Sequence, residues 1–105
     1  MRRLRAPRAR RRGRRLLGEV LWIDGFGNAT TNVSANDLGG ADFRGRRLSI
    51  TIAGHVVPFR SSYAAVTPGR PVALLNSSDL LEIAVNHGSA LTHLGARIGL
   101  RVEVA

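Results

Sequence analysis

Short apolar segments alternate with glycines and small polar residues from Leu16 to the C-terminus. The most regular segment is Leu48–Ile52, in which every second residue is apolar, as in a strand with one buried face. The Ala53-Gly54 pair that follows is typical of a hairpin turn. The return strand would run over His55–Phe59, and Pro58 places it at the edge of a sheet or at its own end.

Five further segments have the length and the apolar or β-branched content of strands. They are Val20–Ile23, Thr30–Val33, Val72–Leu75, Leu81–Ala84 and Leu100–Val104. Val20–Ile23 is apolar on both faces, so we expect it to be covered on both sides, by its own core and by something else, such as another subunit. Ser34 and Ser89 can each cap a short helical turn. The pattern predicts a mainly β fold, a small antiparallel β-barrel-like domain with one or two short helical turns.

The net charge of +9 comes from the N-terminal segment alone. Residues 1–15 hold nine arginines and no acid, whereas residues 16–105 hold seven arginines and seven acids. This predicts a disordered, dispensable Arg-rich tail over residues 1–15 and one β-barrel-like domain over residues 16–105. The tail could hold nucleic-acid phosphates, but no aromatic residue is interleaved for base stacking, so nucleic acid is not the expected partner.

Several kinds of chemistry are excluded or unsupported by the residues present. The chain has no cysteine, which excludes disulfides and thiolate metal sites, and its three histidines do not match a ligand spacing. It has no Gly-X-Ser-X-Gly elbow and no complete dinucleotide fingerprint. No apolar run approaches the ~18 residues of a membrane span. We therefore expect a soluble, cytoplasmic chain with no membrane partner, no metal, and no catalytic residue identifiable from pattern alone.

Two polar segments and one tyrosine remain as candidates for binding. Asn76–Asp79 lies between two apolar strands, so its hydroxyls and N–H groups would lie at the rim of a sheet, where a charged head group can be held. Its residue types also suit a plain tight turn. Phe26 and Asn28 could present a ring and a donor–acceptor amide to a heterocycle such as adenine, or form an ordinary hairpin turn. Tyr63 could line a planar ligand or pack in the core.

These segments belong to a longer series of motifs. The series comprises Gly18-Glu19-Val20-Leu21-Trp22-Ile23-Asp24, Phe26-Gly27-Asn28, Thr31-Asn32-Val33, Tyr63, Asn76-Ser77-Ser78, Leu81-Glu82-Ile83-Ala84-Val85-Asn86 and Gly88-Ser89-Ala90. In this order the motifs resemble the S-adenosylmethionine (SAM) hydroxide adenosyltransferases, relatives of the bacterial SAM-dependent chlorinase and fluorinase. The resemblance is to the C-terminal domain of that family and covers roughly residues 17–104.

The resemblance implies a fold, a reaction and partners. Members of the family have two domains and form trimers, and SAM binds between the N-terminal α/β domain of one subunit and the C-terminal β domain of its neighbour. Water or hydroxide attacks the 5′ carbon, and methionine leaves from the sulfonium to give adenosine. The expected partners are therefore SAM or adenosine, an N-terminal α/β catalytic domain on a separate chain, and further copies in a homotrimer. SAM is the substrate, and no cofactor is implied.

The resemblance also assigns roles to individual residues. The implied substrate-binding residues are Phe26, Asn28, Tyr63, Ser77, Ser78, Asn86 and His87. By this resemblance the two serines hold the methionine head group and the other five residues, or their backbone, contact the adenine. Glu82 belongs to the motif, and we expect a structural role for it.

The sequence departs from the family in two ways. Asp79 stands where the family usually has glycine, which matters if that position needs positive φ and if a carboxylate binds beside it. The N-terminal domain is missing, so we expect a solitary domain from a truncated or split gene that is not active alone. The alternative functions are a small basic-tailed β-barrel that binds nucleic acid, and a non-catalytic remnant.

Overall fold

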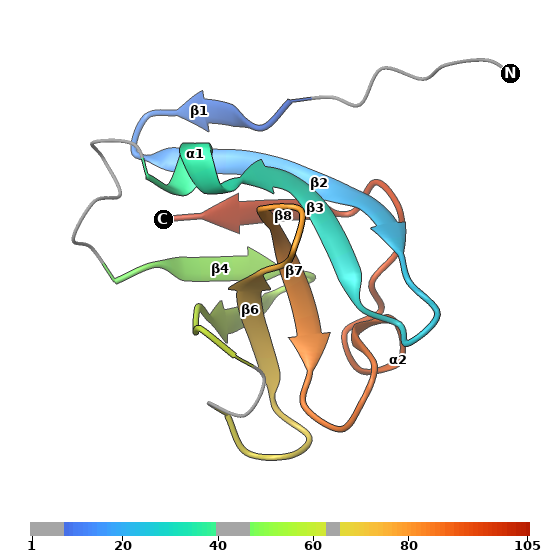
Figure 1. Cartoon of the computed structure of the whole chain (residues 1–105). Helices are drawn as coiled ribbons and strands as arrows, with labels where there is room; N and C mark the ends of the chain where they lie inside the picture. The colour runs from blue at the N-terminus through green and yellow to red at the C-terminus, as the bar shows by residue number, and fades with distance from the viewer. Residues whose placement is uncertain (1–7, 40–46, 63–65) are drawn as a thin grey trace, which may run out of the picture.

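The computed structural model describes residues 8–39, 47–62 and 66–105 of the chain. These residues form eight strands and two short helices (Figure 1). The elements are β1 (Arg10–Arg12), β2 (Arg15–Ile23), β3 (Ala29–Ser34), α1 (Ala35–Leu38), β4 (Ser49–Ile52), β5 (His55–Pro58), β6 (Pro71–Leu75), β7 (Leu80–Val85), α2 (Ala90–His93) and β8 (Arg101–Val104).

The strands make one antiparallel sheet that curls into a nearly closed barrel. Their order is β5-β4-β8-β2-β3-β7-β6, and β1 pairs with the start of β2. The two ends of this order meet where Phe59, just after β5, bridges to Ala73 of β6, and the Arg60 N–H donates to the Ala73 carbonyl at 2.8 Å. The mainly β, barrel-like fold expected from the sequence is confirmed, and α1 and α2 are the expected helical turns.

The core fills the barrel and comes from alternate residues of its strands. In β4, Ile50 and Ile52 are buried, whereas Ser49 is exposed. The largest fully buried core side chains are Val20, Val33, Ile50, Ile52, Val57, Leu81, Ile83, Val102 and Val104. Full burial of such a side chain stabilises a fold by ~1.5–3 kcal/mol, so this interior is the main source of stability.

The local turn signals in the sequence are confirmed. Ser34 caps α1, since its hydroxyl accepts the Asp37 N–H and the Asp37 carboxylate accepts the Ser34 N–H. Ser89 caps α2 through the Thr92 N–H. Positive φ at both Ala53 and Gly54 joins β4 to β5 by a two-residue turn whose twist suits a hairpin.

The central strand β2 carries more pairings than the sequence indicated. It pairs with β8 over residues 16–19 and with β3 over residues 20–23, with a register shift between Val20 and Trp22. A Cβ at Gly18 would lie 2.5 Å from the amide oxygen of Asn32. Because Gly18 has no side chain, that oxygen can accept the Glu19 N–H at 2.8 Å.

The N-terminal arginines contribute a strand where the sequence analysis expected no regular structure. Arg10–Arg12 pairs with residues 15–17, and Gly13, at a φ of 61°, begins the connecting turn. β2 therefore begins at Arg15, one residue before the expected domain boundary. β1 forms because β3 leaves the first part of that edge of β2 unpaired, and backbone hydrogen bonds do not depend on apolar side chains.

Two expectations about aromatic residues are not settled within this chain. The side chain of Trp22 is 44% exposed, so the described part of the chain does not supply the second cover expected over β2. Tyr63 lies outside the described residues, and its predicted contact with adenine stays a prediction.

Candidate functional site

The carboxylate of Asp24 makes three of the hydrogen bonds that hold the turn between β2 and β3. Asp24 Oδ1 accepts the backbone N–H groups of Phe26 and Asn28, each at 2.9 Å, and Asp24 Oδ2 accepts the side-chain amide of Asn28 at 3.3 Å. This fixes the Asn28 side chain at the end of the barrel and leaves the Phe26 ring 83% exposed. An exposed ring beside an oriented amide is an arrangement that can receive a flat heterocycle.

This turn packs on the segment that follows β7. Gly27 is buried at a φ of 83°, and a Cβ there would lie 1.9 Å from Ser89 Oγ and 2.8 Å from Ser89 Cβ. The absence of a side chain at Gly27 therefore sets how closely the two segments approach. It brings Phe26 and Asn28 to the same end of the barrel as Asn86 and His87, as Figure 1 shows for the β2–β3 turn and the loop after β7.

Asn86 and His87 have different surroundings at this end. The Asn86 side chain donates to the Val66 carbonyl at 2.8 Å, and its backbone N–H donates to the Arg70 carbonyl at 3.0 Å. These bonds tie the loop before β6 to β7, so the side chain of Asn86 has a structural role. His87 is exposed and has a φ of 56°, which turns its backbone away from the strand direction. The predicted backbone contact with adenine remains compatible with this geometry.

The turn between β6 and β7 is organised by Asn76. Its Oδ1 accepts the N–H groups of Ser78 at 2.9 Å and Leu80 at 3.2 Å, and its Nδ2 donates to Glu82 Oε1 at 3.3 Å. Ser77 and Ser78 are exposed at the tip of this turn. The geometry thus unites the two alternatives from the sequence, because a tight turn presents the hydroxyls that a charged head group would need.

Glu82 lies beneath this turn, on the outer face of the sheet. It is only 7% exposed and is paired in register with Thr30 of β3 and Leu74 of β6. A buried carboxylate needs hydrogen-bond donors, and the Asn76 amide supplies one that also sets the direction of that amide. The structural role expected for Glu82 is confirmed.

Asp79 adopts the conformation that glycine favours. Its φ is 59°, while its N–H donates to the Asn76 carbonyl at 3.0 Å and its carbonyl accepts the Ala35 N–H at 2.8 Å. The departure from the family's glycine therefore matters for the backbone, because this position has a positive φ. The Asp79 carboxylate is exposed next to Ser77 and Ser78, so it places a negative charge where a ligand carboxylate would bind.

Replacing Asp79 by glycine is expected to stabilise the domain by about 0.5 kcal/mol. A left-handed conformation costs an L-residue ~1–2 kcal/mol, and added freedom of the unfolded chain offsets ~0.4–1 kcal/mol of that gain. The melting temperature should rise by about 2–4 °C in circular dichroism. Ser78→Gly is the matched control, because Ser78 has no positive φ and should not gain stability. A lower melting temperature for Asp79→Gly would contradict this account of the turn.

The predicted substrate residues form two groups at opposite ends of β7. Phe26, Asn28, Asn86 and His87 lie where β7 ends, and Ser77 and Ser78 lie where it begins (Figure 1). Five residue steps along the strand separate the two ends by roughly 17 Å. A single ligand that touches both groups must therefore lie extended along the strand.

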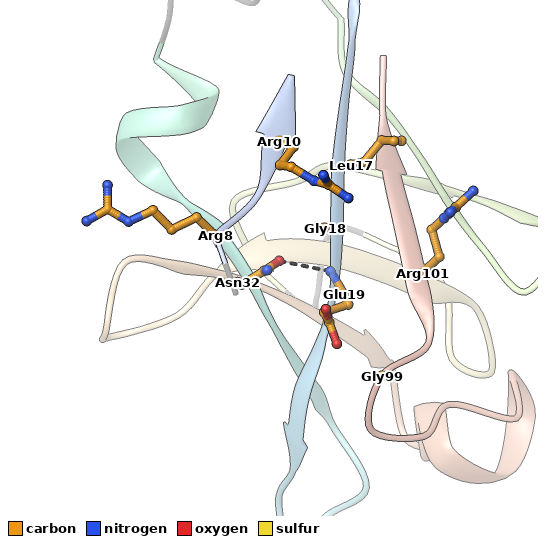
Figure 2. A pocket seen from close by; sticks show the side chains of 8 residues that line it. All are labelled: Arg8, Arg10, Leu17, Gly18, Glu19, Asn32, Gly99 and Arg101. Carbon is orange, nitrogen blue, oxygen red and sulfur yellow. Dashed lines mark hydrogen bonds between the residues drawn. The ribbon is translucent and has the colours of Figure 1, made fainter. Parts of the chain in front are cut away.

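A cavity elsewhere on the barrel is lined by none of these residues. Its volume is about 380 Å³, and Figure 2 shows the residues that line it: Arg8, Arg10, Leu17, Gly18, Glu19, Asn32, Gly99 and Arg101. The six predicted substrate residues that the structure describes lie at the two ends of β7 and not in this cavity. Among the described residues there is no group of three or more His, Asp or Glu side chains that could hold a metal ion, and no helix long and apolar enough to cross a membrane.

Sequence reasoning missed the two residues that organise the site. Asp24 and Asn76 hold the turns, but the sequence analysis placed them only within its motifs and did not assign them this organising role. A signal was available for both, because Asp and Asn commonly accept N–H groups from residues two positions further along the chain. Asp24-Gly25-Phe26 and Asn76-Ser77-Ser78 each have that form.

Comparison with known proteins identifies a matching family model and a relative of similar sequence. The family model "SAM hydroxide adenosyltransferase C-terminal domain" matches residues 18–103. The (R)-S-adenosyl-L-methionine hydrolase of Thermus thermophilus is 41% identical over 87 residues, which are 83% of this chain and 31% of that protein. The chain thus spans about a third of the length of that relative.

Solved structures agree on the fold. A conserved hypothetical protein from Thermus thermophilus superposes with a TM-score of 0.71 and 39% identity, over 85% of this chain and 34% of that one. An uncharacterised conserved protein from Thermotoga maritima superposes with a TM-score of 0.80 over 97% of this chain and 40% of the other. At 24% identity this second likeness shows the fold alone.

Proposed function

The chain belongs to the SAM hydroxide adenosyltransferase C-terminal domain family, and we propose that it supplies the face of a SAM hydrolase site that holds the adenine and the methionine head group. In this proposal Phe26 and Asn28 receive the adenine, and Ser77 and Ser78 receive the amino-acid end. One observation carries it: two hydrogen-bonded turns present an aromatic ring with an amide at one end of β7 and two hydroxyls at the other, and an Asx side chain organises each turn.

The chemistry at each turn suits one end of SAM. The Asn28 amide can donate to one nitrogen of adenine and accept from another group on the same edge, while the exposed Phe26 ring covers apolar surface. The exposed hydroxyls of Ser77 and Ser78 can hydrogen-bond the carboxylate and ammonium of methionine. Because both turns are held by several hydrogen bonds, little ordering is needed when the ligand binds.

The reaction itself needs groups that this face does not provide. Water oxygen bonds to the 5′ carbon as the carbon–sulfur bond breaks, methionine keeps that electron pair, and the water loses a proton. The products are adenosine, methionine and that proton. In our proposal, a second domain positions the water and the ribose, and this chain fixes the two ends of SAM so that the 5′ carbon is held between them. That second domain would lie on a separate chain, and a homotrimer would bring neighbouring faces together.

We place this role in the cytoplasm, where reducing conditions keep disulfides rare and a domain without cysteine loses nothing.

Affinity for SAM should be weak in the chain alone, because the ligand would lie on an open surface with only one side covered. Titration followed by nuclear magnetic resonance suits such binding, since it detects millimolar affinities and reports each residue separately.

Fragments of SAM are expected to perturb different ends of the barrel. Adenosine should shift the amide resonances of Phe26 and Asn28, methionine should shift those of Ser77 and Ser78, and SAM should shift both sets, because each fragment has its partner on one turn only. The roughly 17 Å between the turns keeps the two responses separate. Amides of Thr51 in β4, away from both turns, provide the internal control.

Matched variants make the assignment sharper. Asn28→Ala should abolish the adenosine response and leave the methionine response intact, and Ser77→Ala with Ser78→Ala should do the reverse. If adenosine instead shifted the Ser77–Ser78 turn, or if both fragments perturbed the same residues, the division of the site between the two turns would be wrong.

A further inference from the structure

One outer face of the sheet is basic. Side chains alternate across a strand, and Arg10 of β1, Leu17 of β2 and Glu103 of β8 are register partners, so all three point to the same face. Five arginines lie on this face, which we call the basic face: Arg8, Arg10, Arg12, Arg15 and Arg101. Only two carboxylates of the described residues share it, those of Glu19 and Glu103.

The outer surface of β2 forms a shallow floor, and arginines on the neighbouring strands β1 and β8 lie on either side of it. Figure 2 shows Arg10 on β1 and Arg101 on β8, with Leu17 on β2 between these strands. Two strand spacings make this floor about 10 Å wide, and alternate residues along β1 repeat every ~6.7 Å. The cavity of about 380 Å³ described above opens here. A narrow floor with a line of arginines on the β1 side and Arg101 on the β8 side can receive an extended anion.

The guanidinium groups are largely uncompensated. Arg15 pairs with Glu103 at 3.7 Å, but within the described part of the chain no hydrogen bond or ion pair engages the guanidinium of Arg10, Arg12 or Arg101. Glu19 lies opposite Arg101 in the ladder and offsets part of its charge. Arg12 and Arg15 are direct cross-strand partners, and like charges in that relation repel.

From these observations we propose that the basic face binds a linear anion with consecutive phosphates. Arginine recognises phosphate through paired N–H donors, and the arginines of β1 repeat along a line, as the charges of such an anion do. Bound phosphate would also relieve the repulsion between Arg12 and Arg15. Inorganic polyphosphate and the backbone of a single-stranded nucleic acid share this chemistry. The proposal is independent of the SAM site, which lies at the ends of β7.

The test compares Arg101 of the basic face with an exposed arginine elsewhere on the domain. The full chain is titrated into a fluorescent thymidine oligonucleotide at several salt concentrations, and inorganic polyphosphate is then added as a competitor. Arg101→Gln should weaken binding and reduce the slope of log affinity against log salt by ~0.7, the value for one phosphate contact to a single strand. Arg70→Gln is the matched control, because Arg70 is also exposed, carries the same charge and lies before β6. It should leave the slope unchanged.

Each outcome decides the proposal. Displacement by polyphosphate at equal phosphate concentration identifies a soluble polyphosphate as a sufficient ligand, and stronger oligonucleotide binding with the same dependence on Arg101 identifies the nucleic-acid backbone. Equal effects of Arg101→Gln and Arg70→Gln would show that net charge and the tail alone bind, and would overturn the proposal. Failure of polyphosphate to compete even at a large excess of phosphate would overturn it too. Circular dichroism confirms that both variants fold.

Discussion

Incubated with SAM, the purified chain is expected to release adenosine and methionine no faster than buffer does. Correct positioning of reactants is worth ~7–11 kcal/mol in well-oriented systems, and this chain provides one side of that positioning. Losing only about 4 kcal/mol of it slows a reaction about a thousandfold. The chain spans 31% of the hydrolase that it resembles in sequence. In our proposal the groups that hold the ribose and the water therefore belong to another domain.

Liquid chromatography of both products after long incubation measures this directly. Asn28→Ala is the control, because that side chain is oriented by Asp24 and is the group best suited to the adenine edge. Removing it would leave that edge unpaired at a cost of ~1–3 kcal/mol in a desolvated contact. Rapid turnover that disappears in Asn28→Ala would mean that copies of this chain assemble a complete site, and the proposal of a single face would then be wrong.

The regular part of the fold could be predicted from the sequence. The alternation over Leu48–Ile52 fixed which side chains are buried, and the Ala53-Gly54 pair located the hairpin. Both signals are local, since periodicity and turn chemistry act over a few residues. The closure of the sheet by Phe59 and Ala73 had no such signal, because it joins segments whose meeting depends on the curvature of the whole barrel.

The site could be predicted only in part, for a related reason. The polar residues of each segment predicted a turn, but the sequence could not show that Asn28 and Ser77 lie at opposite ends of β7. Their separation follows from the register of β3 on β7, in which Ala29 faces Ile83 and Ser34 faces Leu80. Register is set by long-range packing and by irregularities such as the shift within this ladder.

The strand β1 is an element that the side-chain pattern did not predict. Its arginines carry no apolar periodicity, so composition favoured a solvated tail, yet the backbone of Arg10–Arg12 pairs with β2. Strand pairing at an open edge uses N–H and C=O groups that every residue except proline has. Side-chain pattern alone therefore cannot exclude a strand beside an edge that the fold leaves unpaired.

Gly27→Ala is expected to destabilise the domain by about 3 kcal/mol, the largest effect of any single methyl addition considered for this chain. The φ of 83° at Gly27 disfavours an L-residue by ~1–2 kcal/mol. The new methyl group would also lie 1.9 Å from Ser89 Oγ and 2.8 Å from Ser89 Cβ. The hydroxyl can rotate away, but Cβ moves only with the backbone, and such overpacking costs a further ~1–3 kcal/mol. The melting temperature should fall by more than about 10 °C.

Gly54→Ala separates the two contributions. Gly54 has a φ of 79°, close to that of Gly27, but nothing lies within 4 Å of the position that its Cβ would take. Its substitution should therefore cost only the conformational part, ~1–2 kcal/mol. The difference between the two variants in urea unfolding then measures the contact between the β2–β3 turn and Ser89. Because that contact brings Phe26 and Asn28 to the end of β7, Gly27→Ala should also weaken the adenosine response while Gly54→Ala preserves it. Equal destabilisation by both substitutions would show that the two segments are not closely packed, and that the adenine-facing group is not preformed.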